Sequence, residues 1–315
     1  MTIRNRIFAA PMSGVSDLPF RQRAWQAGAG MVVSEMVASG ELGNGHKASL
    51  RRLKHEATGP CVVQLAGCRA DWMAQAARIA VDEGADVVDI NMGCPAKKVI
   101  GGLSGAALMR DVPHALSLIE AVVKAVPVPV TLKMRLGWDE TMQNAPALAW
   151  QAEQAGVKMI TVHGRTRMQL YTGKADWQAV RAVREAISVP LVVNGDIKSR
   201  EDAVRAMDIS GADAVMIGRA SYGRPWAAGE IAGHALPCDL SAYILAHYEA
   251  MLEYYGEHTG MRHARKHLDW YLQRHCAGRY TAEERTALVT ATDIPVVKAL
   301  LEKIFARRQE NSRVA

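Results

Sequence analysis

The stretch CVVQLAGCRADWMAQAARIAVDEGADVVDIN, residues 61–91, contains one complete strand–helix–strand unit. It begins with the apolar run CVVQLA (61–66), continues as an Ala-rich segment that ends at Gly84, and finishes with the apolar run DVVDIN (86–91). Helices commonly end at a glycine, and continuous apolar strands are typical of a parallel sheet that helices cover. The unit therefore predicts two parallel strands joined by a crossover helix.

The same unit recurs along the first 238 residues. Apolar runs typical of strands stand at 7–12, 31–36, 61–66, 86–91, 128–134, 159–164, 190–196 and 213–218. Eight such units in roughly 230 residues match a (β/α)8 barrel in number and size. A doubly wound open sheet is the alternative, but GAG (28–30) and GGLSG (101–105) do not make its glycine-rich fingerprint. We therefore predict an α/β TIM barrel for residues 1–238.

The pattern changes in residues 239–315, which contain no convincing strand. Two sets of apolar residues recur there at helical spacing, namely Ile244, Tyr248, Leu252 and Tyr255, and Met261, Ala264, Leu268 and Leu272. Two further helices are expected at 282–291 and 296–309. The sequence thus predicts a TIM barrel followed by a small C-terminal all-helical domain.

Composition limits the classes of protein to which the chain can belong. Apolar residues make up 49% of the 315 residues, and no apolar run is long enough to cross a bilayer. The N-terminal apolar run is too short for a secretion signal. The five cysteines (Cys61, Cys68, Cys94, Cys238 and Cys276) are irregularly spaced, which disfavours a zinc site and a disulfide framework. These features favour a cytoplasmic protein without a metal.

The formal net charge of +6 at pH 7 is mild support for a polyanionic partner such as nucleic acid. A basic soluble enzyme with a small substrate has the same charge, so charge by itself leaves both classes open.

Polar side chains follow nearly every predicted strand. They include Ser13, Glu35, Gln64, Asn91, Cys94, Lys133, Arg135, His163, Arg165, Asn194, Asp196 and Arg219. The carboxyl ends of TIM-barrel strands meet at one rim, which carries the active site. Because a core would not tolerate so many unpaired polar groups, the sequence predicts a lined binding pocket at this rim.

The ends of the last two strands predict a phosphate site. Asn194–Gly195–Asp196 and Gly218–Arg219 stand where barrels commonly hold a phosphate. Glycine lets backbone N–H groups approach an anion, and an arginine adds a charged hydrogen bond.

Lys133 ends the fifth strand deep in the predicted barrel, where an unpaired ammonium is costly. It therefore needs a bound negative charge or a carboxylate. A flavin suits it, because reduced flavin carries negative charge near N1, and Gln64 and Asn91 could then bind the ring edge. A salt bridge to Glu35 or Asp89 is the alternative.

Cys94 lies in DINMGCPAKK (89–98), in the loop after the fourth strand. A free thiol has a pKa near 8.5, so at neutral pH it keeps its proton and can act as a general acid. Lys97 and Lys98 could instead lower that pKa and make the thiol a nucleophile. A buried, unreactive cysteine is a third interpretation, and it is the one that suits Cys61.

Seven motifs together resemble the tRNA-dihydrouridine synthases, and most closely their bacterial B-type branch. They are PMSGVSD (11–17), the Gln64 strand, DINMGCPAKK (89–98), LKMRLGW (132–138), HGRTR (163–167), NGD (194–196) and IGR (217–219). The motifs appear in the family's order and spacing. Ser13 departs from the alanine that is common there, which matters little because the main chain makes that contact.

The resemblance implies an FMN enzyme that reduces the C5=C6 bond of a D-loop uridine in tRNA, with NADPH as electron source. Its FMN-binding residues would be Pro11, Met12, Ser13, Gln64, Lys133, His163, Asn194, Gly195, Asp196, Gly218 and Arg219. Cys94 would give a proton to C5 after hydride reaches C6. The substrate-binding residues would include Asn91, Lys97, Lys98, Arg135 and Arg165. For the two lysines, a solvated loop explains the sequence equally well.

The segment MRHARKHLDWYLQRH (261–275) is suited to grip RNA. With its apolar positions inward, the other half of the helix carries Arg262, His263, Lys266, His267, Trp270 and Arg274. Basic groups interleaved with an aromatic fit phosphate contact and stacking, and a solvated helix face is the alternative. We predict that Arg262 and Lys266 bind tRNA near the D-loop and elbow, that 1–238 binds FMN, that 239–315 binds tRNA, and that the protein is a monomer.

Two rival functions remain at this point. A dihydroorotate dehydrogenase-like flavoenzyme shares the barrel, FMN and a loop after strand four, but it needs neither a basic helical tail nor HGRTR. An RNA-binding protein with a catalytically idle barrel would need no flavin.

Overall fold

The computed structural model describes residues 3–56, 59–235 and 237–312, and its barrel is built on one parallel sheet. The strands are β1 (Ile7–Ala9), β2 (Met31–Val32), β3 (Val37–Ala38), β4 (Val62–Ala66), β5 (Val87–Met92), β6 (Val130–Arg135), β7 (Met159–His163), β8 (Leu191–Asn194) and β9 (Ala214–Ile217). They pair in the order β2-β1-β9-β8-β7-β6-β5-β4-β3.

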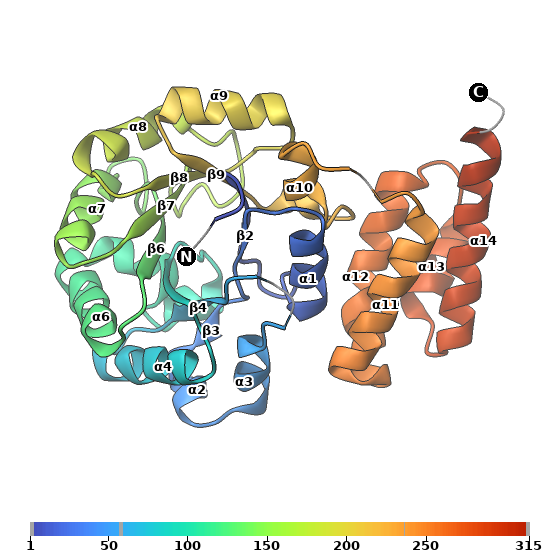
Figure 1. The fold of residues 1–315 in the computed structure, drawn as a ribbon, viewed down its shortest axis with the longest axis horizontal. Helices are drawn as coiled ribbons and strands as arrows, with labels where there is room; N and C mark the ends of the chain where they lie inside the picture. The colour runs from blue at the N-terminus through green and yellow to red at the C-terminus, as the bar shows by residue number, and fades with distance from the viewer. Residues whose placement is uncertain (1–2, 57–58, 236, 313–315) are drawn as a thin grey trace.

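Residues 31–38 close this sheet into a ring. β2 pairs with β1 at one end of the strand order, β3 pairs with β4 at the other end, and Val33 bridges Val62 between them. Both ends of the sheet thus belong to one segment of chain. The predicted TIM-barrel class is confirmed, and Figure 1 shows the helices surrounding the strands.

The single strand predicted at 31–36 is instead broken into β2 and β3. Polar side chains replace ladder bonds at the break: Ser34 Oγ accepts the Gln64 N–H at 3.0 Å, and the Glu35 carboxylate accepts the Gly14 N–H at 2.5 Å. A β-branched run predicts extended backbone, but it does not show where side chains take over the pairing.

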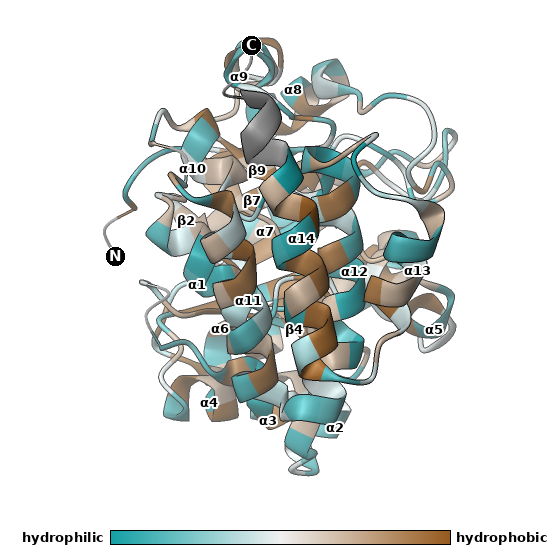
Figure 2. Cartoon of the chain, turned by 90° about the vertical axis from the view of Figure 1, so that its right-hand side faces the viewer, coloured by the Kyte–Doolittle hydropathy of each residue, from teal (hydrophilic) through white to brown (hydrophobic). Residues whose placement is uncertain are grey.

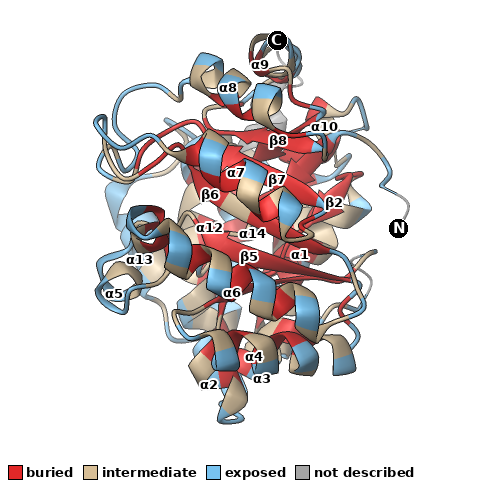
Figure 3. Ribbon diagram, turned by 90° about the vertical axis from the view of Figure 1, so that its left-hand side faces the viewer, coloured by how far each residue is buried: buried red, intermediate tan, exposed pale blue. Residues whose placement is uncertain are grey.

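Helices cover the outside of the barrel. They are α1 (Leu18–Gln26), α2 (Ser39–Gly43), α3 (Lys47–Leu53), α4 (Ala70–Asp82), α6 (Val112–Ala125), α7 (Ala145–Gln154), α8 (Trp177–Ala186), α9 (Arg200–Ser210) and α10 (Ala227–Ile231). Short segments follow two strand ends, namely α5 (Lys97–Gly101) and the 3-10 helix η1 (Gly105–Arg110) after β5, and the 3-10 helix η2 (Arg219–Ser221) after β9. Figure 3 shows buried strands behind helices whose outer faces are exposed.

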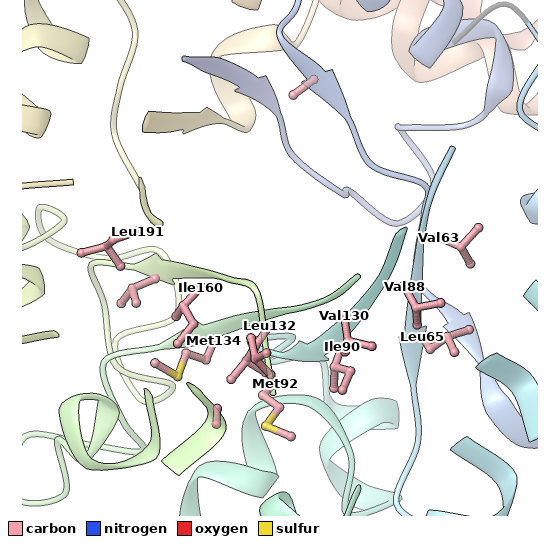
Figure 4. Packing of buried hydrophobic residues seen from close by; sticks show 14 of the residues in the cluster. Val63, Leu65, Val88, Ile90, Met92, Val130, Leu132, Met134, Ile160 and Leu191 are labelled. Carbon is pink, nitrogen blue, oxygen red and sulfur yellow. The ribbon is translucent and has the colours of Figure 1, made fainter. Parts of the chain in front are cut away.

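Alternate residues of each strand face the helices or the barrel interior. Figure 4 shows part of the outward set, which includes Val63, Leu65, Val88, Ile90, Leu132, Met134, Ile160 and Leu191 and belongs to the main apolar cluster with the helices. A second cluster fills the interior near the amino ends of the strands, with Phe8, Val62, Val87, Met159 and Val192. The register then sets polar residues in successive inward rows: Gln64, Asp89 and Thr131, next Asn91, Lys133 and Thr161, and finally Arg135, His163 and Asn194.

The chain ends in four helices that have their own apolar cluster. They are α11 (Leu240–Tyr255), α12 (Glu257–His275), α13 (Ala282–Thr290) and α14 (Ile294–Ser312), and residues such as Tyr248, Leu268 and Ile304 are buried between them. Figure 1 places this bundle beside α1 and α10, and Figure 2 shows α11 and α14 with apolar and polar residues interspersed along each helix. None of the helices within the described residues combines the length and hydrophobicity that crossing a bilayer requires.

Candidate active site

A cavity of about 1670 Å³ opens at the carboxyl ends of the barrel strands. Every residue predicted to bind the cofactor lines it, namely Pro11, Met12, Ser13, Gln64, Lys133, His163, Asn194, Gly195, Asp196, Gly218 and Arg219. Asn91, Cys94, Lys97, Arg135 and Arg165 line it as well, whereas Lys98, Arg262 and Lys266 do not. The pocket predicted at the rim formed by the strand ends is therefore present as a cavity.

Lys133 extends from β6 into this cavity without a carboxylate partner among the described residues. Its Nζ donates to Asn194 Oδ1 at 3.0 Å. Glu35 and Asp89, the partners left open by the sequence, bond to other groups instead. Burial, assisted by the charge of Arg135, lowers the pKa of Lys133 to about 8. Because an ammonium has three N–H bonds, the site has spare donors for an anion.

Asp89 anchors a chain of amides at the bottom of the cavity. Its carboxylate accepts Thr131 Oγ1 at 2.6 Å and Gln64 Nε2 at 2.7 Å, and Gln64 Oε1 accepts Asn91 Nδ2 at 2.7 Å. Burial raises the pKa of Asp89, and these two hydrogen bonds oppose that shift. Each amide nitrogen carries two hydrogens, so Gln64 and Asn91 are fixed in place and still have one N–H each to offer.

The Cys94 loop is held at the cavity from both sides. Asn91 Oδ1 accepts the backbone N–H groups of Gly93 and Cys94 at 3.2 and 3.0 Å, and the Cys94 carbonyl accepts the Ala106 N–H at 3.0 Å. The partly exposed Cys94 lines the cavity, which no other cysteine among the described residues does. Cys61, by contrast, is buried, and burial raises its pKa to about 11. Asn91 therefore positions the loop that carries the reactive thiol candidate.

Arg135 joins two loops rather than facing solvent. The residue is 1% exposed, and its guanidinium donates to the carbonyls of Gly93 at 2.8 Å, Thr166 at 2.8 Å and Leu170 at 2.9 Å. Burial lowers the pKa of Arg135 to about 10. An arginine so enclosed is better suited to hold the Cys94 loop than to bind an RNA phosphate.

Arg165 is equally enclosed, and its main partner is Asp196. Its guanidinium donates to both Asp196 carboxylate oxygens, at 3.1 and 2.5 Å, and to the Gly173 carbonyl at 2.7 Å. Asp196 also accepts the Ala175 N–H at 2.8 Å and an Arg219 N–H at 3.2 Å. Burial opposes ionisation of Asp196, but these bonds hold its pKa below the usual range. The group is an ionised carboxylate that orders the loop after β7.

His163 and Gly195 meet beside this carboxylate. Burial, together with the charges of Lys133 and Arg135, lowers the pKa of His163 well below its ordinary value, so the ring is neutral at pH 7. Gly195 has φ +121°, and a Cβ there would lie 2.9 Å from the imidazole. Glycine is thus required for close packing. At Gly218 an added Cβ would meet nothing closer than 3.9 Å.

The turn after β1 uses most of its own main-chain groups. The Met12 N–H donates to Ser16 Oγ at 2.8 Å, and the Met12 carbonyl accepts the Val15 and Ser16 N–H groups at 2.9 Å. Among the described residues, the Ser13 N–H and the Pro11 carbonyl form no hydrogen bond. These two groups therefore remain for a ligand in the cavity.

Helix α12 contacts the barrel on the side where the sequence placed an RNA-facing surface. His267 is 2% exposed with its ring 6.2 Å from Phe20, and Trp270 stacks on Tyr222 with 4.0 Å between ring centroids. The outward placement of His267 and Trp270 was wrong, because α12 packs against α11 and also against Phe20 and Tyr222 of the barrel, so that two of its faces are covered. An apolar stripe that repeats every 3.6 residues in the sequence reveals only the more apolar of these two buried faces.

The predicted tail contacts differ in exposure. Arg262 is exposed, whereas Lys266 is half-buried with Nζ close to Gly14, and the charges of Asp17 and Glu35 act on it. Lys266 is therefore placed to join the tail to the barrel, and Arg262 to meet a partner in solution.

The loop after β7 also brings residues that the sequence did not single out. Tyr171 is 51% exposed at the cavity, with the guanidinium carbons of Arg219 and Arg135 at 4.7 and 5.6 Å from its ring centre. Arg167 and Lys174 of the same loop are further cations at the cavity, and only the position of HGRTR at the start of the loop could have indicated them. Other elements bring Lys198, Arg205 and Arg274 to the cavity, and of these the sequence singled out Arg274. Within the described residues there is no group of three or more side chains that could hold a metal ion.

Comparison with known proteins decides the family. A sequence profile described as dihydrouridine synthase matches residues 8–308. The chain belongs to the dihydrouridine synthase family. A "Probable tRNA-dihydrouridine synthase" of Rhizobium leguminosarum bv. phaseoli is 58% identical over 96% of this chain and 95% of its own length. The "tRNA-dihydrouridine synthase B" of Pseudomonas aeruginosa is 44% identical over 98% of this chain and 96% of its own length. The predicted family is confirmed, with B-type relatives among the matches.

Solved structures share the barrel of this dihydrouridine synthase family member at low sequence identity. Morphinone reductase in complex with tetrahydroNAD superposes with a TM-score of 0.54 at 16% identity, over 75% of this chain and 89% of that one. The old yellow enzyme homologue of Zymomonas mobilis gives 0.52 at 17% identity, over 71% and 89%. At such identities the likeness concerns the fold.

Proposed function

We propose that the protein is a tRNA-dihydrouridine synthase, which reduces the C5=C6 bond of a D-loop uridine with FMN as cofactor and NADPH as reductant. The observation that carries the proposal is the meeting of Lys133 and Cys94 in one cavity of a dihydrouridine synthase family member. Relatives that match nearly the whole chain are named tRNA-dihydrouridine synthases, which supports tRNA as the substrate.

The donor set of the cavity fits FMN. Lys133 has a lowered pKa and spare N–H donors, so a flavin edge that carries negative charge would satisfy it. Gln64 and Asn91 offer amide N–H groups to the ring, and Ser13 offers its main-chain N–H. Arg219, whose side chain is 45% exposed, is available to a phosphate. The volume of about 1670 Å³ exceeds what one small ligand needs, so cofactor and substrate base have room together.

Cys94 is the proton donor in this proposal. When bound and reduced, FMN supplies a hydride to C6 of the uracil. Negative charge then develops toward C5 and the C4 carbonyl, and the Cys94 thiol gives its proton to C5, so that one hydride and one proton complete the reduction. The thiolate regains a proton from solvent. Asn91 holds the loop so that the thiol stays at the cavity.

The substrate base must leave its stack to reach the cavity, which requires contacts to the surrounding RNA. Lys97, Arg167, Lys174 and Arg274 lie at the cavity and Arg262 is exposed on α12. These cations can bind the backbone of the RNA around the extruded base. We assign FMN binding to 1–238 and tRNA contacts to 239–315 together with the cavity rim, in a cytoplasmic monomer.

Anaerobic absorbance spectra test the proposal against its rivals. The purified protein should be yellow, NADPH should bleach the flavin band, and unmodified tRNA should restore it. Bleaching by dihydroorotate and restoration by orotate would indicate the dihydroorotate dehydrogenase-like rival. A colourless protein that binds tRNA but takes up no FMN would indicate the idle RNA-binding barrel.

A further inference from the structure

A second cavity, of about 540 Å³, lies beside the first one, and we name it the α5 groove. It is bordered by α5, η1, the start of α6 and the loop after β6. Ile100, Leu103, Leu108 and Trp138 give it apolar walls. No residue of this groove other than Lys97 has a role in the proposed reaction, and its volume falls in the range of small-ligand sites.

The α5 groove continues from the candidate active site. Lys97 lines both cavities. The segment η1, which borders the groove, is attached to the Cys94 loop, because the Ala106 N–H donates to the Cys94 carbonyl at 3.0 Å. A Cβ on Gly105 would lie 2.8 Å from that carbonyl oxygen, so the two segments are in direct contact. A chain that leaves the thiol can therefore enter the groove.

Cations surround the apolar walls. Lys97 and Arg110 border the groove, and the guanidinium carbons of Arg110 and Arg167 each lie 4.9 Å from the ring centre of Trp138. The Nε of Arg167 is buried without a hydrogen-bond partner. Asp111 also borders the groove, but its carboxylate caps α6 by accepting the His114 N–H at 3.1 Å. The groove thus combines apolar contact area with positive charge.

Leu103 is the most unusual residue of the groove. It is 67% exposed, and its φ of +54° lies in the left-handed region that a leucine rarely adopts. Such a conformation costs on the order of 1–2 kcal/mol, which a glycine would avoid. Gly102 stands immediately before it and Gly101 one residue earlier, so glycines are present in the same turn but not at the left-handed position. An exposed apolar side chain kept at such a cost indicates a contact with a ligand.

We propose that the α5 groove binds a nucleotide that neighbours the target uridine in the substrate RNA, with its base against Leu103 and Trp138. Its phosphates would lie near Lys97 and Arg110. Unstacked bases bind proteins through apolar and aromatic surfaces, and their phosphates through cations, which is the combination found here. In Figure 2, α5 and α13 lie on the side of the molecule opposite the N-terminus, so groove and tail can meet one RNA. This inference rests on the proposed function, since it requires an RNA substrate.

Kinetics with unmodified tRNA test the groove. Leu103→Asn tolerates the left-handed backbone but removes the apolar side chain, and Arg110→Ser removes the guanidinium. Leu103→Asn should raise the KM for tRNA about tenfold, the order expected for the loss of one base contact. Arg110→Ser should raise the KM several-fold through the loss of one phosphate contact. FMN content and the rate of flavin reduction by NADPH should stay unchanged. Leu103→Met should keep most of the wild-type KM, and Arg78→Ser, an exposed arginine on α4, serves as the matched control.

A crosslink locates the nucleotide independently. 4-Thiouridine placed on either side of the target uridine should crosslink to peptides that contain Leu103 or Trp138. If the KM for tRNA is unchanged in Leu103→Asn and Arg110→Ser and the crosslinks form only elsewhere, the α5 groove is not the nucleotide site. Reduction of tRNA by the wild type would still support the proposed function in that case. A wild type that reduces no tRNA would overturn the proposed function itself, and the groove assignment with it.

Discussion

Removing the charge of Lys133 should stabilise the protein that lacks its cofactor. Burial lowers the pKa of this lysine from 10.5 to about 8, which corresponds to about 3 kcal/mol at about 1.4 kcal/mol per unit of pKa. Lys133→Met removes that cost but also loses the hydrogen bond to Asn194, worth about 1 kcal/mol. We therefore expect the free energy of unfolding of the flavin-free variant to exceed that of the flavin-free wild type by about 2 kcal/mol at pH 7.

The pH dependence of this difference has a definite sign. Below pH 8 the lysine is charged in both folded and unfolded chains, so the wild type bears the whole cost. Between pH 8 and 10.5 the folded chain loses its proton first, and the wild type gains stability as pH rises. The advantage of Lys133→Met should thus be largest below pH 8 and shrink toward pH 10.5. Urea unfolding at several pH values, with FMN removed, measures it.

Addition of FMN should reverse the order of the two proteins. In our account the cofactor supplies the anion that Lys133 lacks, so the FMN Kd of Lys133→Met should rise at least tenfold, and FMN should stabilise the wild type more. Lys158→Met, an exposed lysine just before β7, is the matched control and should leave both quantities unchanged. A flavin-free Lys133→Met variant that is less stable than the wild type at pH 7 and binds FMN equally well would exclude this role for Lys133.

Three further predictions follow from the geometry. Cys94→Ala should keep FMN and NADPH oxidation but lose about 10²- to 10⁴-fold in dihydrouridine formation, whereas Cys68→Ala, which does not line the cavity, should keep wild-type activity; equal rates for the two variants would remove the thiol from the mechanism. Arg262→Glu should raise the KM for tRNA several-fold without changing NADPH oxidation, and an effect no larger than that of Arg78→Glu would count against a tail contact. Asp17→Asn should raise the free energy of unfolding at pH 8 by up to about 4 kcal/mol, because burial raises the pKa of Asp17 from 3.8 to about 7 and asparagine still caps α1. This gain should vanish below about pH 4, where the carboxyl group is protonated in both the folded and the unfolded chain. Denaturation curves in which the gain does not depend on pH would contradict the prediction.

The sequence predicted the barrel and the cavity well because both depend on local pattern. Strand-end residues such as Lys133, His163 and Asn194 meet because parallel strands end at one rim, whatever the loops do. Their spacing along the chain was therefore enough to place them together.

The sequence did not show how the arginines of the site are engaged. Arg135 and Arg165 stand at strand ends and resemble substrate ligands, but their partners are the carbonyls of Gly93, Thr166 and Gly173 and the Asp196 carboxylate. Which loop carbonyls turn toward a guanidinium is decided by loop conformation, and that conformation leaves no periodic signal.

The second buried face of α12 escaped prediction for a related reason. His267 and Trp270 are amphipathic, so these residue types are compatible with a solvated helix face, with an RNA contact and with a helix–barrel interface. Only the packing against Phe20 and Tyr222 distinguishes them. Leu103 differs from them in the opposite direction, because it is an apolar residue that is exposed. Nothing in the sequence of the loop indicated that it would be exposed in a left-handed turn.

The nucleoside masses of tRNA after incubation with the protein are the sharpest test of the proposed reaction. Unmodified tRNA should be incubated with the protein, FMN and NADPH, digested to nucleosides and weighed by mass spectrometry. We expect a uridine derivative heavier by two hydrogen atoms, and its near absence with Cys94→Ala. A protein that binds and reduces FMN but leaves every uridine at its original mass would contradict it.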